Sequence, residues 1–104
     1  MNSADQSASG VEELHLIAYD VSSNRRRYRL ARMLEGHGRR VQESVFEAWL
    51  TPRQREELLV RAEHLLHPDR DRLACYALTA DDLCRVRFLG VAAAVTPNVD
   101  YTIL

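Results

Sequence analysis

The order of hydrophobic and polar positions predicts three apolar strands at the start and end of the chain. Residues 14–19 read LHLIAY, with apolar side chains in both alternating sets, so we expect a strand covered on both faces. Asp20 follows in phase with Leu14, Leu16 and Ala18 and should share their face at the end of this strand. Residues 73–78 and 86–90 predict two further strands.

Residues 40–50, RVQESVFEAWL, contain Val, Phe and Trp at a density typical of sheet structure. Their length permits either two short strands or one long strand interrupted by a bulge. Phe46 and Trp49 are predicted to lie in the core or in an interface rather than to stack on nucleic-acid bases.

The first predicted helix begins after three consecutive residues that can act as N-caps, Ser22, Ser23 and Asn24. It should run to about residue 37 and stop at Gly36 and Gly38. Apolar spacing of three and four residues predicts an inward stripe made of Leu30, Met33, Leu34 and His37.

A second helix is predicted from Thr51, which can cap it, with Pro52 in the first turn and Gln54 completing a capping box. Pro68 should end it. Its predicted inward face comprises Leu58, Leu59, Ala62, Leu65 and Leu66.

The resulting order, β-α-β-β-α-β with an additional C-terminal strand, predicts an α+β ferredoxin-like sandwich with both helices on one face of the sheet. Residues 1–10 are small and polar, which predicts a disordered N-terminal extension. Residues 11–90 are predicted to form the domain, and residues 91–104 a tail that could dock on a partner as a strand. A first strand covered on both faces, beside a sheet with helices on one face only, predicts a dimer through the bare face.

The length of 104 residues fits one domain. No apolar run approaches the length that spans a membrane and the N-terminus has no signal-peptide pattern, so we predict a cytoplasmic protein without a membrane partner. Cys75 and Cys84 fit no disulfide framework or zinc spacing and are predicted to be reduced thiols.

The charge of the chain is unevenly distributed although its net value is only −1. All fourteen basic residues are arginine, and seven of them lie in residues 24–40 beside a single acid, Glu35. Arginine binds phosphate through a planar fork of donors, but an arginine-rich helix face can also be an ordinary solvated surface. With no aromatic ladder nearby, we expect contact with the nucleic-acid backbone. The predicted nucleic-acid-binding residues are Arg25, Arg26, Arg27, Arg29, Arg32 and Arg40.

Several of these segments together resemble the CRISPR-associated Cas-two family. They are Tyr19-Asp20-Val21-Ser22, Asn24-Arg25-Arg26-Arg27, Gly38, and residues 40–47, RVQESVFE. The similarity runs in order through residues 14–90, and it is the combination of these motifs at these spacings that makes it specific.

The resemblance implies a homodimer in prokaryotic antiviral immunity that partners the Cas-one integrase during spacer acquisition and handles spacer DNA, or RNA. It implies a metal-dependent endonuclease, with Mg²⁺ or Mn²⁺ as cofactor. Asp20 matches the metal-binding and catalytic aspartate of the family, and Tyr19, Arg27 and Phe46 match its supporting catalytic positions. A non-catalytic scaffold that bridges integrase subunits and DNA is the alternative.

The chemistry expected at Asp20 depends on a second copy of the chain. Mg²⁺ keeps most of its waters and needs only one or two carboxylates, so two Asp20 side chains facing each other across a twofold axis could share one ion. The alternative is that Asp20 caps the turn into the first helix. His64 and His67 have a spacing that could bind a metal, but no third ligand is evident and we favour a solvated or helix-ending role.

Overall fold

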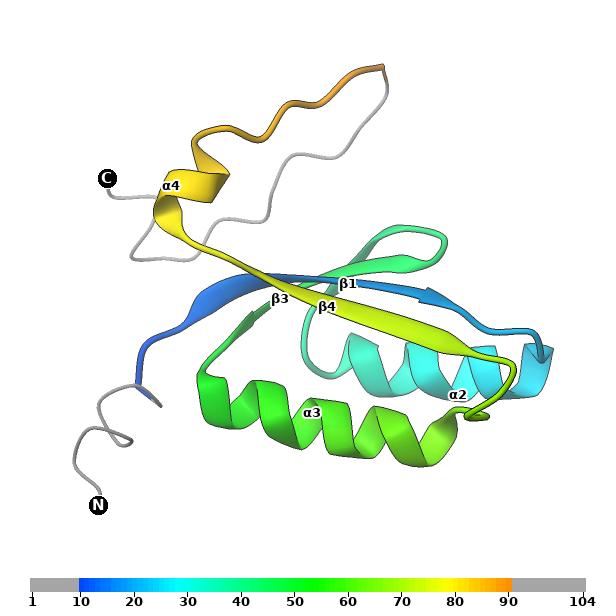
Figure 1. The fold of residues 1–104 in the computed structure, drawn as a ribbon. Coiled ribbons are helices and arrows are strands. Elements are labelled where there is room, and N and C mark those ends of the chain that lie inside the picture. The colour runs from blue at the N-terminus through cyan, green and yellow to red at the C-terminus, as the bar shows by residue number, and fades with distance from the viewer. Residues whose placement is uncertain (1–9, 91–104) are drawn as a thin grey trace.

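A computed structural model describes residues 10–90 of the chain. The elements follow in the order β1 (Glu13–Asp20), α2 (Asn24–Glu35), β2 (Arg39–Gln42), β3 (Val45–Leu50), α3 (Pro52–Leu65), β4 (Arg72–Leu78) and α4 (Ala80–Leu83). The strands form one antiparallel sheet in the order β2-β3-β1-β4. Helices α2 and α3 lie side by side under one face of this sheet (Figure 1), which confirms the ferredoxin-like architecture.

Both long helices begin at the predicted caps. The Ser23 hydroxyl accepts a hydrogen bond from the Arg26 N–H at 3.2 Å and caps α2, and Thr51 and Gln54 form the capping box of α3. Helix α2 ends at Glu35 with Gly36 as its C-cap, so His37 lies just beyond the helix. The rest of its predicted stripe, Leu30, Met33 and Leu34, is buried.

The core lies between the sheet and the two helices. Its largest fully buried side chains include Ile17 from β1, Phe46 and Leu50 from β3, Leu30 from α2 and Leu58 from α3. Alternation along β1 directs His15, Ile17 and Tyr19 into this core, on what we call the helix face of the sheet.

His15 is a polar residue within this apolar layer. Its Nδ1 bonds to the Glu13 carbonyl oxygen at 2.9 Å, while Nε2 has no hydrogen-bond partner among the residues the structure describes. Burial lowers the pKa of His15 below its usual value of 6.5, so the ring is held in its neutral form.

Residues 39–50 form two strands, β2 and β3, which settles the choice that the sequence left open; an irregularity between Arg40 and Gln42 marks the bulge in β2. Gly38 brings the chain from α2 against β3 so closely that a Cβ atom would collide with the Glu47 carbonyl oxygen and lie 2.8 Å from the Ala48 Cβ. A glycine is therefore required at this approach.

The strand expected at 86–90 is not formed, and this prediction was wrong. Thr79 and Asp82 make a capping box that starts α4, and turn hydrogen bonds continue past the helix, from the Arg85 N–H to the Asp82 carbonyl at 3.0 Å and from Val86 to Leu83 at 3.2 Å. This turn carries the chain out of line with β4, so that Val86 and Phe88 face the sheet across a hollow and pair with none of the described strands. The predicted C-terminal docking strand, 91–104, and nearly all of the predicted N-terminal extension lie outside the described residues.

The two cysteines lie in different surroundings. Cys75 is half-buried against the core, where burial raises the pKa of its thiol, and Cys84 is exposed as the C-cap of α4. Both are free thiols. In the part of the chain that the structure describes, no helix has the length and apolar character needed to cross a membrane.

Candidate functional site

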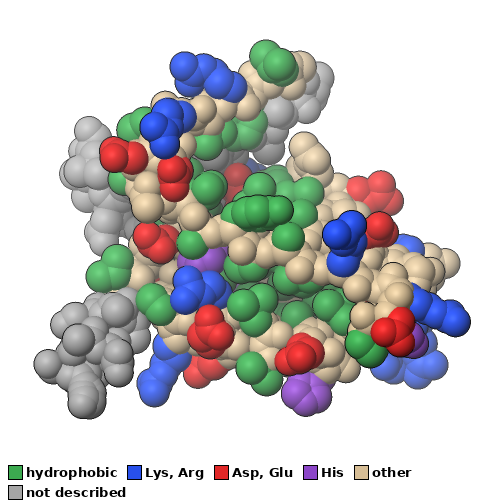
Figure 2. Space-filling view, viewed as in Figure 1, with side chains coloured by type: hydrophobic (Ala, Val, Ile, Leu, Met, Phe, Trp, Pro, Cys, Tyr) green, Lys and Arg blue, Asp and Glu red, His purple; other side chains and the backbone are tan. Residues whose placement is uncertain are grey.

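The face of the sheet opposite the helices carries an apolar surface, which we call the open face. Strand register places Leu16 beside Tyr76, Ala18 between Ala74 and Val45, and Asp20 beside Arg72. Tyr76 is 55% exposed, and Figure 2 shows hydrophobic side chains gathered along this edge of the sheet. A hollow on the open face is lined mainly by Leu14, Leu16, Val45, Leu78, Val86 and Phe88.

The expectation that β1 is covered on both faces is confirmed only in part. Leu14 is buried on the open face, but Leu16 and Ala18 are only half-buried there, whereas His15 and Ile17 on the helix face are fully buried. The second half of β1 therefore presents partly exposed apolar atoms next to Asp20.

Asp20 is the last residue of β1, and its side chain is exposed on the open face. Within residues 10–90 its carboxylate has no hydrogen bond or ion pair, and the cap of α2 is Ser23, so the capping role considered for Asp20 is wrong. No group of three or more His, Cys, Asp or Glu side chains in the described range is arranged to hold a metal ion. One carboxylate is enough to bind an ion that keeps most of its water ligands, provided that further ligands come from outside the chain.

The predicted supporting residues lie on the helix side of the sheet, whereas Asp20 is on the open face. Tyr19 points into the core, where its hydroxyl donates to the Glu43 carbonyl oxygen at 3.3 Å and its ring lies 6.2 Å from the Phe46 ring, centroid to centroid. Burial raises the pKa of Tyr19. Arg27 donates to the Val21 carbonyl oxygen at 2.7 Å and to the Asn24 side chain. The Arg27 contacts hold the turn after Asp20, and the catalytic roles given to Tyr19, Arg27 and Phe46 stay predictions.

Asp71, which no sequence pattern marked as functional, accepts more hydrogen bonds than any other described carboxylate of this region. Its side chain is completely shielded from solvent and accepts hydrogen bonds from three residues. The donors are the Ser22 N–H and hydroxyl at 3.0 and 3.2 Å, Arg26 Nε and Nη2 at 2.6 and 3.1 Å, and the His67 N–H at 2.8 Å. These contacts, the Arg26 bond first, hold the pKa of Asp71 well below its usual value. Asp71 lies in a polar loop, where residue spacing predicts no partner.

The arginines of α2 divide into two groups. Arg25, Arg29 and Arg32 are exposed at positions i, i+4 and i+7 of α2 and form what we call the arginine stripe. Arg26 is instead bound to Asp71, so any contact of Arg26 with nucleic acid would compete with this ion pair. Arg40 lies over the Phe46 ring, with its guanidinium carbon 5.5 Å from the centroid. The nucleic-acid-binding roles of all these arginines stay predictions.

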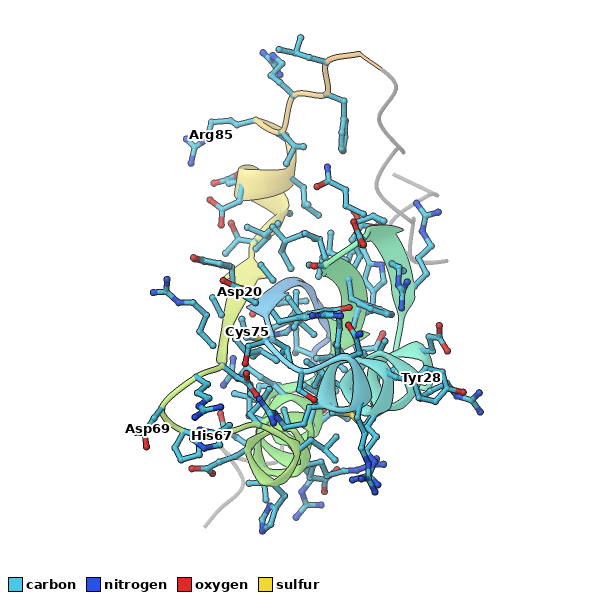
Figure 3. The ribbon with its side chains drawn as sticks, turned by 90° about the vertical axis from the view of Figure 1, so that its right-hand side faces the viewer. Asp20, Tyr28, His67, Asp69, Cys75 and Arg85 are labelled. Atoms are coloured by element: carbon cyan, nitrogen blue, oxygen red, sulfur yellow. The ribbon has the colours of Figure 1, made fainter. Side chains whose placement is uncertain are left out.

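Tyr28 is an aromatic side chain within the exposed part of this stripe that the sequence argument overlooked. It is 63% exposed and points outward from α2, away from Asp20 (Figure 3). Arg32 Nη1 donates to its hydroxyl at 3.2 Å, and the Arg32 guanidinium carbon lies 5.8 Å from the ring centroid.

His64 and His67 engage backbone atoms rather than each other. His64 Nδ1 lies 2.8 Å from the Val60 carbonyl oxygen, and His67 Nδ1 accepts from the Asp69 N–H at 3.1 Å. This agrees with the helix-ending and solvated roles favoured from the sequence.

The family model described as "CRISPR associated protein Cas2" matches residues 13–86 of the chain. The chain belongs to the Cas2 family. The match covers β1 to α4, and therefore includes both the open face with Asp20 and the arginine stripe of α2.

Named Cas2 proteins agree with this assignment in sequence and in structure. The CRISPR-associated endoribonuclease Cas2 of Thermus thermophilus is 44% identical over 81 residues, which are 77% of this chain and 86% of that protein. Streptococcus pyogenes Cas2 has a TM-score of 0.67 with 29% identity, covering 74% of this chain and 99% of that one. A chain of a partial Cas6-RT-Cas1–Cas2 complex has a TM-score of 0.65 with 29% identity, covering 84% and 96%.

Proposed function

We propose that this Cas2 protein is a homodimeric, metal-dependent endonuclease that hydrolyses phosphodiester bonds in RNA or DNA and works with Cas1 in spacer acquisition in the cytoplasm. The observation that carries the proposal is the exposed Asp20 carboxylate at the edge of an apolar open face, without a hydrogen bond or ion pair among the described residues. The names of the relatives, endoribonuclease and a complex with Cas1, support the reaction and the partner.

The dimer brings together two open faces. A single chain exposes apolar surface to water at Leu16, Ala18, Val45 and Tyr76. Burying such surface stabilises association by about 25 cal/mol for each Å² removed from water. A twofold axis through this face places the same patch on both subunits. Asp20, at the edge of the patch, then approaches its own copy.

Mg²⁺ or Mn²⁺ fits the resulting site, in which the two Asp20 carboxylates would hold the ion and water would complete its coordination. When bound, the ion supplies an acidified water and stabilises the negative charge that develops on the phosphate. Arg25, Arg29 and Arg32 contribute positive charge on an exposed surface of the same subunit, where they bind the nucleic-acid backbone.

The nuclease proposal is tested by Asp20→Ala. We expect cleavage of RNA and DNA substrates in Mg²⁺ or Mn²⁺ to fall by about 10²-fold or more, because the ion loses its protein ligand. The matched control is Asp69→Ala, which removes an exposed carboxylate from the loop before β4. Full metal-dependent cleavage by the Asp20 variant would remove this residue from the mechanism.

The dimer is tested by a matched pair of tyrosine substitutions. Tyr76→Glu places a charge on the open face and is expected to give monomers, whereas Tyr28→Glu changes an equally exposed tyrosine of α2 and is expected to leave the dimer intact. Sedimentation equilibrium measures both. A Tyr76 variant that remains dimeric at micromolar concentration would place the interface elsewhere.

A second candidate function is a non-catalytic scaffold for Cas1 and spacer DNA. It is favoured by the similarity to a chain from a partial Cas6-RT-Cas1–Cas2 complex. Spacer acquisition in cells that carry Asp20→Ala separates the two functions. Normal acquisition alongside lost cleavage supports the scaffold, and lost acquisition with intact dimers supports the nuclease.

A further inference from the structure

The surface of the two helices that points away from the sheet has a hollow between α2 and α3. Four basic side chains line it, Arg29 and Arg32 from α2 and Arg61 and His64 from α3. Met33, Val60 and Leu65 supply its apolar lining. We call this region the α2–α3 surface. It lies on the opposite side of the sheet from the open face (Figure 1).

The arginines of the α2–α3 surface are available to an anion. Within the described residues, none of Arg29, Arg32 and Arg61 has an ion pair with a carboxylate. Arg61 Nη1 instead lies 3.5 Å from Nε2 of His37, which follows α2. Burial, and then the charge of Arg61, lower the pKa of His37, which favours the neutral ring. A neutral imidazole nitrogen can accept a hydrogen bond from Arg61, and the guanidinium keeps its positive charge.

Helix α3 separates its charges between two sides. Arg61 and His64 face α2, whereas Glu63 lines a different hollow, beside Asp71 and the start of β4. Figure 2 shows acidic side chains over the side of α3 that faces the viewer, on the β4 side. Glu57 is one acid whose charge acts on this region, since it raises the pKa of His37. A net positive surface remains between the helices.

We propose that the α2–α3 surface binds the sugar-phosphate backbone of duplex nucleic acid, and that Arg61 and His64 of α3 extend the contacts made by the arginine stripe of α2. The inference rests on the proposed nucleic-acid-handling function and adds to it a second helix. Arginine matches phosphate geometry, and a backbone contact tolerates any sequence.

The dimensions of the stripe fit a strand of phosphates. Arg25 and Arg32 are seven residues apart on α2, or about 10 Å along the helix axis. One strand of duplex DNA carries a charge for about every 3.4 Å of its axis, so a stripe of this length can contact more than one phosphate of the same strand. The hollow beside it combines basic side chains with the apolar Met33, Val60 and Leu65, and no Phe, Tyr or Trp lines it, which suits contact with sugar and phosphate rather than stacking on a base.

The test is the salt dependence of binding of the full-length dimer to a mixed-sequence duplex DNA, by fluorescence anisotropy. A plot of log K against log salt concentration becomes less steep by about 0.9 for each phosphate contact that is lost. At 0.1 M salt this corresponds to a roughly eightfold weaker affinity. We expect this change for Arg61→Ala, and a change in the same direction for His64→Ala. Arg85→Ala is the matched control, because Arg85 is 77% exposed and lies beside α4, away from the helix surface (Figure 3).

The outcomes separate this inference from the proposed function. A reduced slope for both Arg29→Ala and Arg61→Ala, with the Arg85 variant unchanged, supports the α2–α3 surface. A reduced slope for Arg29→Ala alone confines the contact to α2 and overturns the inference while the proposed function stands. Unchanged binding of DNA by the Arg61 variant together with lost binding of Cas1 identifies a protein-binding surface and also overturns it. Binding that is insensitive to salt in the unmodified protein contradicts both.

Discussion

Asp20 and Asp71 lie at the same end of the sheet but in opposite surroundings. Asp20 pairs in register with Arg72, the first residue of β4, and Asp71 immediately precedes this strand. Asp20 is exposed and carries no partner within the described residues, while Asp71 is fully shielded and accepts five hydrogen bonds. A carboxylate free of internal partners can take a cation or a substrate group, whereas one that is saturated by donors serves the fold.

The two carboxylates are connected through the backbone. Asp71 binds the N–H and the hydroxyl of Ser22, which follows Asp20 by two residues, and also holds Arg26 in the first turn of α2. Arg27 fixes the intervening Val21 carbonyl. The exposed carboxylate is therefore presented by a turn that the shielded one stabilises. A rigid support of this kind is what a functional side chain requires.

The largest effect is expected from Asp71→Ala. The change removes the carboxylate that binds Arg26 and the acceptor for three other donors, two on Ser22 and one on His67. Breaking a shielded hydrogen-bond network of this kind is among the most destabilising effects of a substitution. We expect the melting temperature to fall by roughly 10 °C or more, measured by calorimetry. Asp69→Ala, two residues away and exposed, is the control. A melting temperature equal to that of the control would mean that the hydrogen bonds contribute no net stability.

A second prediction concerns acid. Because the pKa of Asp71 in the folded protein lies below its unfolded value of 3.8, its stabilising contribution is complete above about pH 3.8 and is lost as the pH falls toward the folded pKa. The difference in unfolding free energy between the unmodified protein and Asp71→Asn should therefore shrink below that pH. Urea titrations from pH 7 to pH 3 measure it, and a difference that stays constant over this range contradicts the assignment.

His15 should produce a separate and smaller loss at higher pH. Its folded pKa is lowered from 6.5, so the unfolded chain binds the proton more readily and stability decreases as the pH falls below about 6.5. His15→Phe removes this contribution and should flatten the upper part of the acid profile, while the part below pH 4, due to Asp71, remains. An unchanged profile between pH 6.5 and pH 5 would show that His15 does not titrate there.

The smallest effect is expected for the stability of Asp20→Asn. An exposed side chain without internal contacts contributes little to folding, so the melting temperature should change by no more than about 3 °C. Calorimetry in the absence of divalent ions gives the comparison. A large decrease would show that Asp20, like Asp71, supports the fold, and would remove the contrast between them.

Local features were the most predictable from sequence. Ser23, Thr51 with Gln54, and the inward Leu30, Met33 and Leu34 all act over four residues or fewer, and each is found where the spacing placed it. Alternation along β1 also placed Asp20 on the correct face. The expected strand at 86–90 failed because strand formation depends on a neighbouring edge, which residue pattern alone does not specify.

The candidate site was predictable in part for a similar reason. Asp20 is marked by its position at the end of an apolar strand, but the Asp71 contacts join residues 45 and 49 positions apart, and a polar loop carries no periodicity that reveals them. The division of the arginines into paired Arg26 and exposed Arg25, Arg29 and Arg32 follows from where Asp71 lies. Arg61 was overlooked because its neighbours on the surface belong to another helix.

Because the two cysteines differ in exposure, the protein can be labelled selectively at one of them. A thiol reagent attacks the thiolate, so Cys84, exposed at the end of α4, should react well before Cys75, which is half-buried with a raised pKa. One fluorophore or spin label can thus be attached per chain without mutagenesis, on the side of the sheet away from the helices. Distances between two such labels would report on the spacing of subunits in solution.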